Sequence, residues 1–99
     1  MRGVVSEEGM ERIFVALSNA TRRRLLDSLF ARDSQRPVEL MVDIDMSRQA
    51  VLKHLAVLED AGLVRASRSA GRTVYHLDPA LLEHVHRHWL GKFTLRSSS

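Results

Sequence analysis

The stretch MSRQAVLKHLAVLEDAGLV, residues 46–64, decides the expected fold. Its apolar residues recur every three or four positions, which predicts a helix with one buried stripe. The stripe consists of Val51, Leu55, Leu58 and Ala61. Ser47 can cap the start of this helix, because its hydroxyl can accept a free backbone N–H. Gly62 stands where helices commonly end, because glycine tolerates the left-handed backbone conformation.

The opposite face of the same helix is mostly polar near its beginning. It carries Ser47, Arg48, Gln49, Leu52 and Lys53. Arginine, glutamine and serine at a helix N-terminus can reach base edges and phosphates in a DNA major groove. A shorter helix is predicted over residues 38–44, after Pro37, and Asp45 and Met46 form a tight link. Two helices joined so closely predict a helix-turn-helix over residues 38–61, whose second helix reads DNA.

Residues 63–77 change from a helical to an alternating pattern. Residues 63–68 and 73–77 predict two strands, and SAGR, residues 69–72, supplies a turn in which Gly71 can adopt a positive φ. The hairpin bears Arg65, Arg68 and Arg72 and no acidic residue. A basic hairpin in this place predicts a wing that lies over the DNA backbone or minor groove. The alternative is an exposed hairpin whose arginines serve only solubility.

Two further helices are predicted near the N-terminus. The first covers residues 8–17 and places Met10, Ile13, Phe14 and Leu17 on one face. Asn19 caps the second, whose inward residues are expected to be Leu25, Leu26, Leu29 and Phe30. The short helix after Pro37 is expected to bury Val38, Met41 and either Val42 or Ile44. Arginines 22–24 fall in one turn and form either a solvated face with one salt bridge or a phosphate contact.

The final helix is predicted over residues 79–93, with Asp78 as its cap and Pro79 in its first turn. Its broad apolar face, together with that of residues 8–17, exceeds what one small core uses. We therefore predict a symmetric homodimer joined by these two helices. The expected interface residues are Ile13, Phe14, Leu82, Val85 and Trp89. The alternative is that Trp89 only closes the core of the monomer.

Composition sets the broad class. A chain of 99 residues with 44% hydrophobic and 27% charged residues predicts one mainly α domain with a small β-hairpin over residues 1–99. The net charge is +3, and the absence of cysteine excludes disulfides and thiolate metal sites. No signal peptide or membrane-spanning run is present, so a cytoplasmic protein without a membrane partner is expected. No nucleophile–base pair, carboxylate pair or phosphate-cradling glycine loop indicates an enzyme.

Three segments together resemble the ArsR/SmtB family of winged-helix transcriptional repressors. ALSNATRRRLLDSL, residues 16–29, is similar to the family's second helix, and residues 46–64 are similar to its recognition helix. AGRTVYHL, residues 70–77, is similar to its wing. The resemblance covers residues 8–89, and the order and spacing of the three segments make it fairly specific.

The resemblance implies a dimeric repressor that binds a near-palindromic operator on double-stranded DNA and releases it when an effector binds. Ser47, Arg48, Gln49 and Lys53 match the family's DNA-facing positions, and Gly71 and Arg72 match the wing tip. His54 matches a histidine that is structural or contacts phosphate. Leu52 departs from the usual serine or threonine; it can touch a thymine methyl but cannot donate a hydrogen bond.

The resemblance also bears on metals. Many members bind soft metals through E-L-C-V-C, but residues 39–43 read ELMVD here, so both thiolates are missing and no cofactor is expected. A zinc-responsive repressor is an alternative, because His84 and His88 share one helix face and Asp78 and Glu83 are near in sequence. A protein-interaction module that does not bind DNA is a further alternative. The effector stays unknown.

Overall fold

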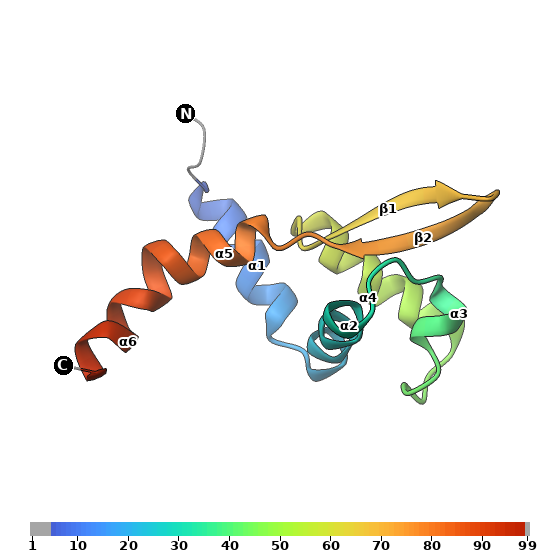
Figure 1. Cartoon of the computed structure of the whole chain (residues 1–99), viewed down its shortest axis with the longest axis horizontal. Coiled ribbons are helices and arrows are strands. Elements are labelled where there is room, and N and C mark those ends of the chain that lie inside the picture. The colour runs from blue at the N-terminus through green and yellow to red at the C-terminus, as the bar shows by residue number, and fades with distance from the viewer. Residues whose placement is uncertain (1–4, 99) are drawn as a thin grey trace.

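The computed structural model describes residues 5–98 and contains helices and one two-stranded sheet (Figure 1). In chain order the elements are α1 (Glu7–Leu17), α2 (Ala20–Ala31), α3 (Pro37–Leu40), α4 (Arg48–Asp60), β1 (Val64–Ser69), β2 (Arg72–Leu77), α5 (Ala80–Val85), the π-helical turn η1 (His86–Leu90) and α6 (Gly91–Ser98). The hairpin and the rod formed by α5, η1 and α6 extend from the helical body in opposite directions (Figure 1). The mainly α fold with a small β-hairpin is confirmed.

Side-chain caps set where three helices begin. The Ser6 hydroxyl accepts the backbone N–H of Gly9 at 3.0 Å, so α1 begins one residue earlier than expected. The predicted caps of the next long helices are confirmed: Asn19 Oδ1 accepts from the Arg22 N–H at 3.1 Å, and Ser47 Oγ accepts from the Ala50 N–H at 3.1 Å.

The hydrophobic core gathers around α4. Val51, Leu55 and Leu58 are fully buried, and Ala61 is nearly so, which confirms the predicted stripe. They belong to one cluster with Leu25 and Leu29 of α2, Ala16 of α1 and Leu63 before the hairpin. Gly62 ends the helix with φ +82°, and a Cβ there would lie 2.7 Å from Leu81 Cδ1. The positive φ therefore favours glycine, and a Cβ would also require the Leu81 side chain to shift.

Two residues predicted to face inward are exposed instead. Phe30 is 82% exposed, because it follows Leu29 by about 100° around α2, and Leu25, Leu26 and Leu29 already occupy the core face. Val38 is also exposed, and of the alternatives Val42 and Ile44 it is Ile44 that is buried. The predicted helix over residues 38–44 is in fact the four-residue α3 followed by turns, so the helical period does not continue. Leu40 and Ile44 enter the core at this place, and Met41 packs against it.

Two of the expected dimer-interface residues belong to the core of the protomer. Ile13 is 0% exposed and Val85 is 1% exposed, so placing them at an interface was wrong. Neighbouring residues on a helix point about 100° apart, so Ile13 cannot share one surface with Phe14. Val85 also closes the core in place of Trp89, which lies outside the core cluster and keeps 39% of its surface exposed.

The hairpin pairs in an antiparallel register from Val64 opposite Leu77 to Ser69 opposite Arg72. Ala70 and Gly71 both have positive φ, 52° and 76°, as a two-residue hairpin turn requires. The positive φ of Gly71 confirms its predicted place in the turn.

The segment between α2 and α3 is tied to the sheet. Gln35 and Tyr75 exchange both backbone hydrogen bonds, at 3.0 and 2.7 Å. The carboxylate of Asp33 accepts the backbone N–H of Leu77 at 2.8 Å, and this hydrogen bond lowers the pKa of Asp33. An isolated β-bridge at Gln35 and the side chain of Asp33 therefore fasten this segment to β2.

The C-terminal rod has a π-helical turn at its centre. The backbone N–H of Gly91 donates to the carbonyl of His86, five residues earlier. A Cβ at Gly91 would lie 2.8 Å from that carbonyl oxygen, so a larger residue would disturb the turn. Within residues 5–98, no helix is both long and apolar enough to cross a membrane.

Candidate nucleic-acid interface

The beginning of α4 presents its polar residues to solvent. Ser47, Arg48, Gln49 and Lys53 are exposed, whereas Leu52 is half-buried and packs against the core. The Ser47 hydroxyl already accepts a hydrogen bond as the helix cap, which leaves its own proton free to donate. Arg48 and Gln49 therefore offer the longest side chains at the end of the helix where a major groove is read.

His54 faces into the fold from the next turn of α4. Its Nδ1 lies 3.2 Å from Nη1 of Arg22. A guanidinium only donates, so Nδ1 accepts and the neutral ring carries its proton on Nε2. Burial lowers the pKa of His54, and the charge of Arg22 lowers it further. This contact supports the structural role expected for His54 rather than the phosphate contact.

The arginines of α2 act within the fold in a way that the sequence did not indicate. Arg22 donates to the carbonyls of Ala16 at 2.8 Å and Val15 at 3.0 Å, and Arg23 donates to that of Leu17 at 2.7 Å. These carbonyls belong to the last turn of α1, where the regular helical hydrogen bonds end. Arg22 and Arg23 therefore cap α1; Arg22 is half-buried and not on a solvated face, whereas Arg23 stays exposed.

The three arginines of the wing, residues 63–77, differ in their partners. Arg65 Nε lies 3.8 Å from Asp78 Oδ2, and Arg68 donates to the carbonyl of Gly71 at 2.8 Å. Arg72 is exposed and has no carboxylate within ion-pair distance in the described part of the chain. Arg72 is thus the wing cation with the most freedom to meet an anion.

One cleft joins the start of α4 to the wing. Arg48, the first residue of α4, and Arg72, the first residue of β2, line a cavity of about 250 Å³ with Pro37, Val38 and Thr73. Arg36, the residue before α3, completes the lining. The predicted helix and wing therefore share one basic surface, as a winged DNA-binding domain needs. Sequence reasoning missed Arg36, although a basic residue just before the helix-starting Pro37 was visible.

The residues considered for zinc do not form a site in the structure. His84 and His88 lie side by side, with ring centroids 4.6 Å apart. Asp78 is turned to Arg65 and to the N–H of Ala80, and Glu83 pairs with Arg87 at 3.3 Å. Among residues 5–98, no three histidine, cysteine, aspartate or glutamate side chains gather closely enough to hold a metal.

Comparison with known proteins agrees with this geometry. The family model described as "Helix-turn-helix domain" matches residues 17–66, from the end of α1 into β1. The chain is 38% identical over 84 residues to an uncharacterized HTH-type transcriptional regulator, YuzN, of Bacillus subtilis (strain 168), covering 79% of this chain and 91% of that one.

Solved structures extend the match to nearly the whole chain. An ArsR-like transcriptional regulator from Rhodococcus sp. RHA1 superposes with a TM-score of 0.79 at 30% identity, covering 92% of this chain and 82% of its own. The homodimeric winged helix-turn-helix DNA-binding domain Mb0332 from Mycobacterium bovis has a TM-score of 0.67 at 26% identity, with 90% and 97% covered. The chain belongs to the ArsR family of helix-turn-helix transcriptional regulators.

Proposed function

We propose that the protein is a homodimeric repressor that places α4 in the major groove and the wing along the DNA backbone. The observation that carries the proposal is the shared basic surface of Arg48, Arg72 and the first turns of α4. The centre of a face built for another protein would be depleted of charged residues, whereas this one carries several cations. The relatives are bacterial transcriptional regulators, so we propose that it acts in the cytoplasm, on DNA, and without catalysis.

The dimer is supported by a row of exposed aromatic rings. Trp89 packs edge-to-face on Phe14 at 5.5 Å and on Phe93 at 5.2 Å, which joins α1 to the C-terminal rod. All three rings are at least one-third exposed, and Leu90 beside them is 43% exposed. We assign Phe14 and Trp89, with the half-buried Leu82 at the edge, to the interface. The homodimeric state of the Mb0332 domain supports the same arrangement.

Residue roles follow from side-chain chemistry and exposure. Arg48 and Gln49 would read base edges, each worth about 1–3 kcal/mol where bidentate. Lys53 and Arg72 would attract phosphates, with smaller contributions from Arg65 and Arg68 because each already has a partner. Ser47 can donate to a phosphate, and Leu52 would touch a thymine methyl only at its exposed edge. Gly71 allows the tip to approach the backbone.

Dimer symmetry gives the proposed operator its form. Two α4 helices related by a twofold axis would read near-palindromic half-sites about one helical turn apart. Binding there would exclude polymerase and repress transcription. The effector is not proposed as a soft metal, because residues 39–43 carry no thiolate.

An electrophoretic or anisotropy titration with the DNA upstream of the protein's own gene tests the proposal. We expect saturable binding of one dimer, stronger than binding to a random duplex of equal length, and a steep loss of affinity with salt. Gln49→Ala should reduce the preference for the operator, whereas Arg72→Ala should lower the affinity for both duplexes by the same factor. If an intact dimer binds neither duplex at 50 mM salt, the repressor hypothesis is refuted, and the alternative of a protein-interaction module is favoured.

A further inference from the structure

We propose that the cleft lined by Arg36, Arg48 and Arg72 holds one phosphate of the DNA backbone between Arg36 and Arg72, beside the base edge that Arg48 would read, and that Arg36 is a phosphate ligand supplied from outside both the recognition helix and the wing. The proposal rests on the proposed DNA-binding function and adds a defined anchoring point to it. Arg36 precedes α3, so the first helix of the helix-turn-helix would also be fastened to DNA.

The lining of the cleft favours an anion. Its three cations come from three different elements, and none of the other lining residues, Pro37, Val38 and Thr73, is acidic. Guanidinium groups brought together without a carboxylate between them repel one another until an anion enters. Arginine binds phosphate with two parallel hydrogen bonds, and the Thr73 hydroxyl can donate a further one.

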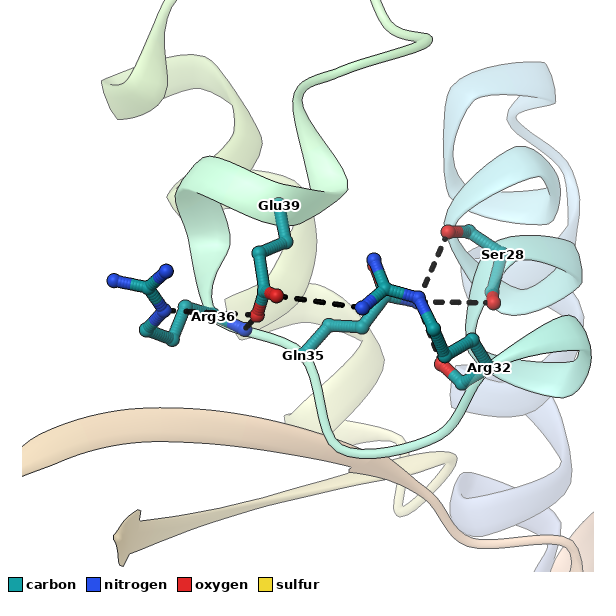
Figure 2. Close-up of polar contacts among 5 residues, drawn as sticks. All are labelled: Ser28, Arg32, Gln35, Arg36 and Glu39. Atoms are coloured by element: carbon teal, nitrogen blue, oxygen red, sulfur yellow. Dashed lines mark hydrogen bonds and ion pairs between the residues drawn. The ribbon is translucent and has the colours of Figure 1, made fainter. Parts of the chain in front are cut away.

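Glu39 orients Arg36 without occupying its outer nitrogens. Glu39 Oε1 accepts the backbone N–H of Arg36 at 2.7 Å and lies 3.6 Å from its Nε. The other carboxylate oxygen accepts from Arg32 at 3.3 Å. In Figure 2 the terminal nitrogens of Arg36 point away from Arg32 and Gln35, and no partner is recorded for them within residues 5–98. Glu39 is thus a positioning residue, and the bidentate edge of Arg36 is free.

The backbone that carries Arg36 is held in place before DNA arrives. Gln35 is 2% exposed, and its amide donates to the carbonyls of Arg32 at 2.6 Å and Ser28 at 3.0 Å (Figure 2). Its own backbone pairs with Tyr75 of β2. Pro37 limits the next φ angle. A ligand held this way loses little conformational entropy on binding.

The size of the cleft suits a small anion. At about 250 Å³ it is smaller than the roughly 300–1,000 Å³ of pockets that bind organic ligands. A tetrahedral phosphate that remains part of the DNA backbone needs only such an open cradle.

The test is the salt dependence of DNA binding by Arg36→Gln, beside Arg12→Gln as the control with the same charge change. Arg12 belongs to α1 and lies beside Val57 and Asp60, at the end of α4 opposite to the one that lines the cleft. Loss of one phosphate contact should reduce the slope of log K against log salt by about 0.9, which is about eightfold in affinity at 0.1 M salt. We expect the same factor for operator and random DNA, no change for Arg12→Gln, and a restored slope for Arg36→Lys.

The proposal and the function beneath it fail in different ways. If Arg36→Gln keeps the wild-type salt slope while Arg72→Gln reduces it, the proposed phosphate site is overturned and DNA binding stands. If inorganic phosphate binds saturably below 1 mM, in a manner that Arg36→Gln abolishes, while the DNA slope is unchanged, the cleft serves a free anion and the DNA assignment is wrong. If the wild-type dimer binds no DNA, the proposed function itself fails.

Discussion

Gln35 should contribute far more to the free energy of unfolding than Gln49, the other glutamine of the chain. It is the buried polar side chain of the described residues, and Gln35→Ala removes hydrogen bonds to Ser28, to the Arg32 carbonyl and from the Arg32 guanidinium at 3.2 Å. The hydrogen bonds donated by the two amide protons and the one accepted by the amide oxygen are lost, at about 1 kcal/mol each. Part of this is recovered by water, and a cavity adds to it. We expect the free energy of unfolding to fall by about 2–3 kcal/mol.

Gln49→Ala is the matched control, because it makes the same chemical change at an exposed position of α4. It should alter the free energy of unfolding by about 0.5 kcal/mol at most. Urea unfolding followed by circular dichroism measures both, at one fixed protein concentration because the proposed dimer would link stability to concentration. With a slope of about 1–3 kcal/mol per molar urea, the midpoint of Gln35→Ala should fall by about 0.7–3 M.

The two variants should also separate on DNA. Gln49→Ala keeps stability and reduces sequence preference, whereas folded Gln35→Ala keeps the preference. Gln35→Ala should modestly lower the affinity for every DNA sequence, because the backbone before Arg36 becomes more mobile. A midpoint for Gln35→Ala within 0.3 M of wild type would refute the reasoning, because the buried amide network would then contribute no net stability.

Three further outcomes are expected. Gly91→Ala should destabilise the C-terminal rod by about 1–3 kcal/mol, seen in thermal melts, because its Cβ would meet a carbonyl at 2.8 Å. His54 has a lowered pKa when folded, so the stability it confers is complete above its unfolded pKa of about 6.5 and is lost as the pH falls toward the folded value. His54→Asn should flatten the dependence of stability on pH between 7 and 5, and an unchanged dependence would contradict this. Trp89→Ala should weaken dimerisation at least tenfold in sedimentation equilibrium, whereas Val42→Ala, at an exposed residue outside the proposed interface, should not.

The local parts of this protein could be predicted because each is encoded in adjacent residues. The apolar spacing in α4, the caps at Asn19 and Ser47, and the positive φ of Gly62 and Gly71 depend on neighbours within one or two turns. These features suffice for the helix-turn-helix and the wing. They also place Arg48, Gln49 and Lys53 on the exposed side of the recognition helix.

Long-range pairing required the tertiary structure. Arg22 reaches His54, 32 residues away, and Gln35 meets Tyr75, while the cleft unites Arg36 with two arginines of other elements. Periodicity records only that a residue faces inward or outward, as the misplaced Phe30 shows, and it contains no information on which surfaces meet. The sequence alone therefore determined the class of the protein and the helix proposed to read DNA. Packing decided which cations are used inside the fold and which remain free for a phosphate, because that depends on distances between segments far apart in the chain.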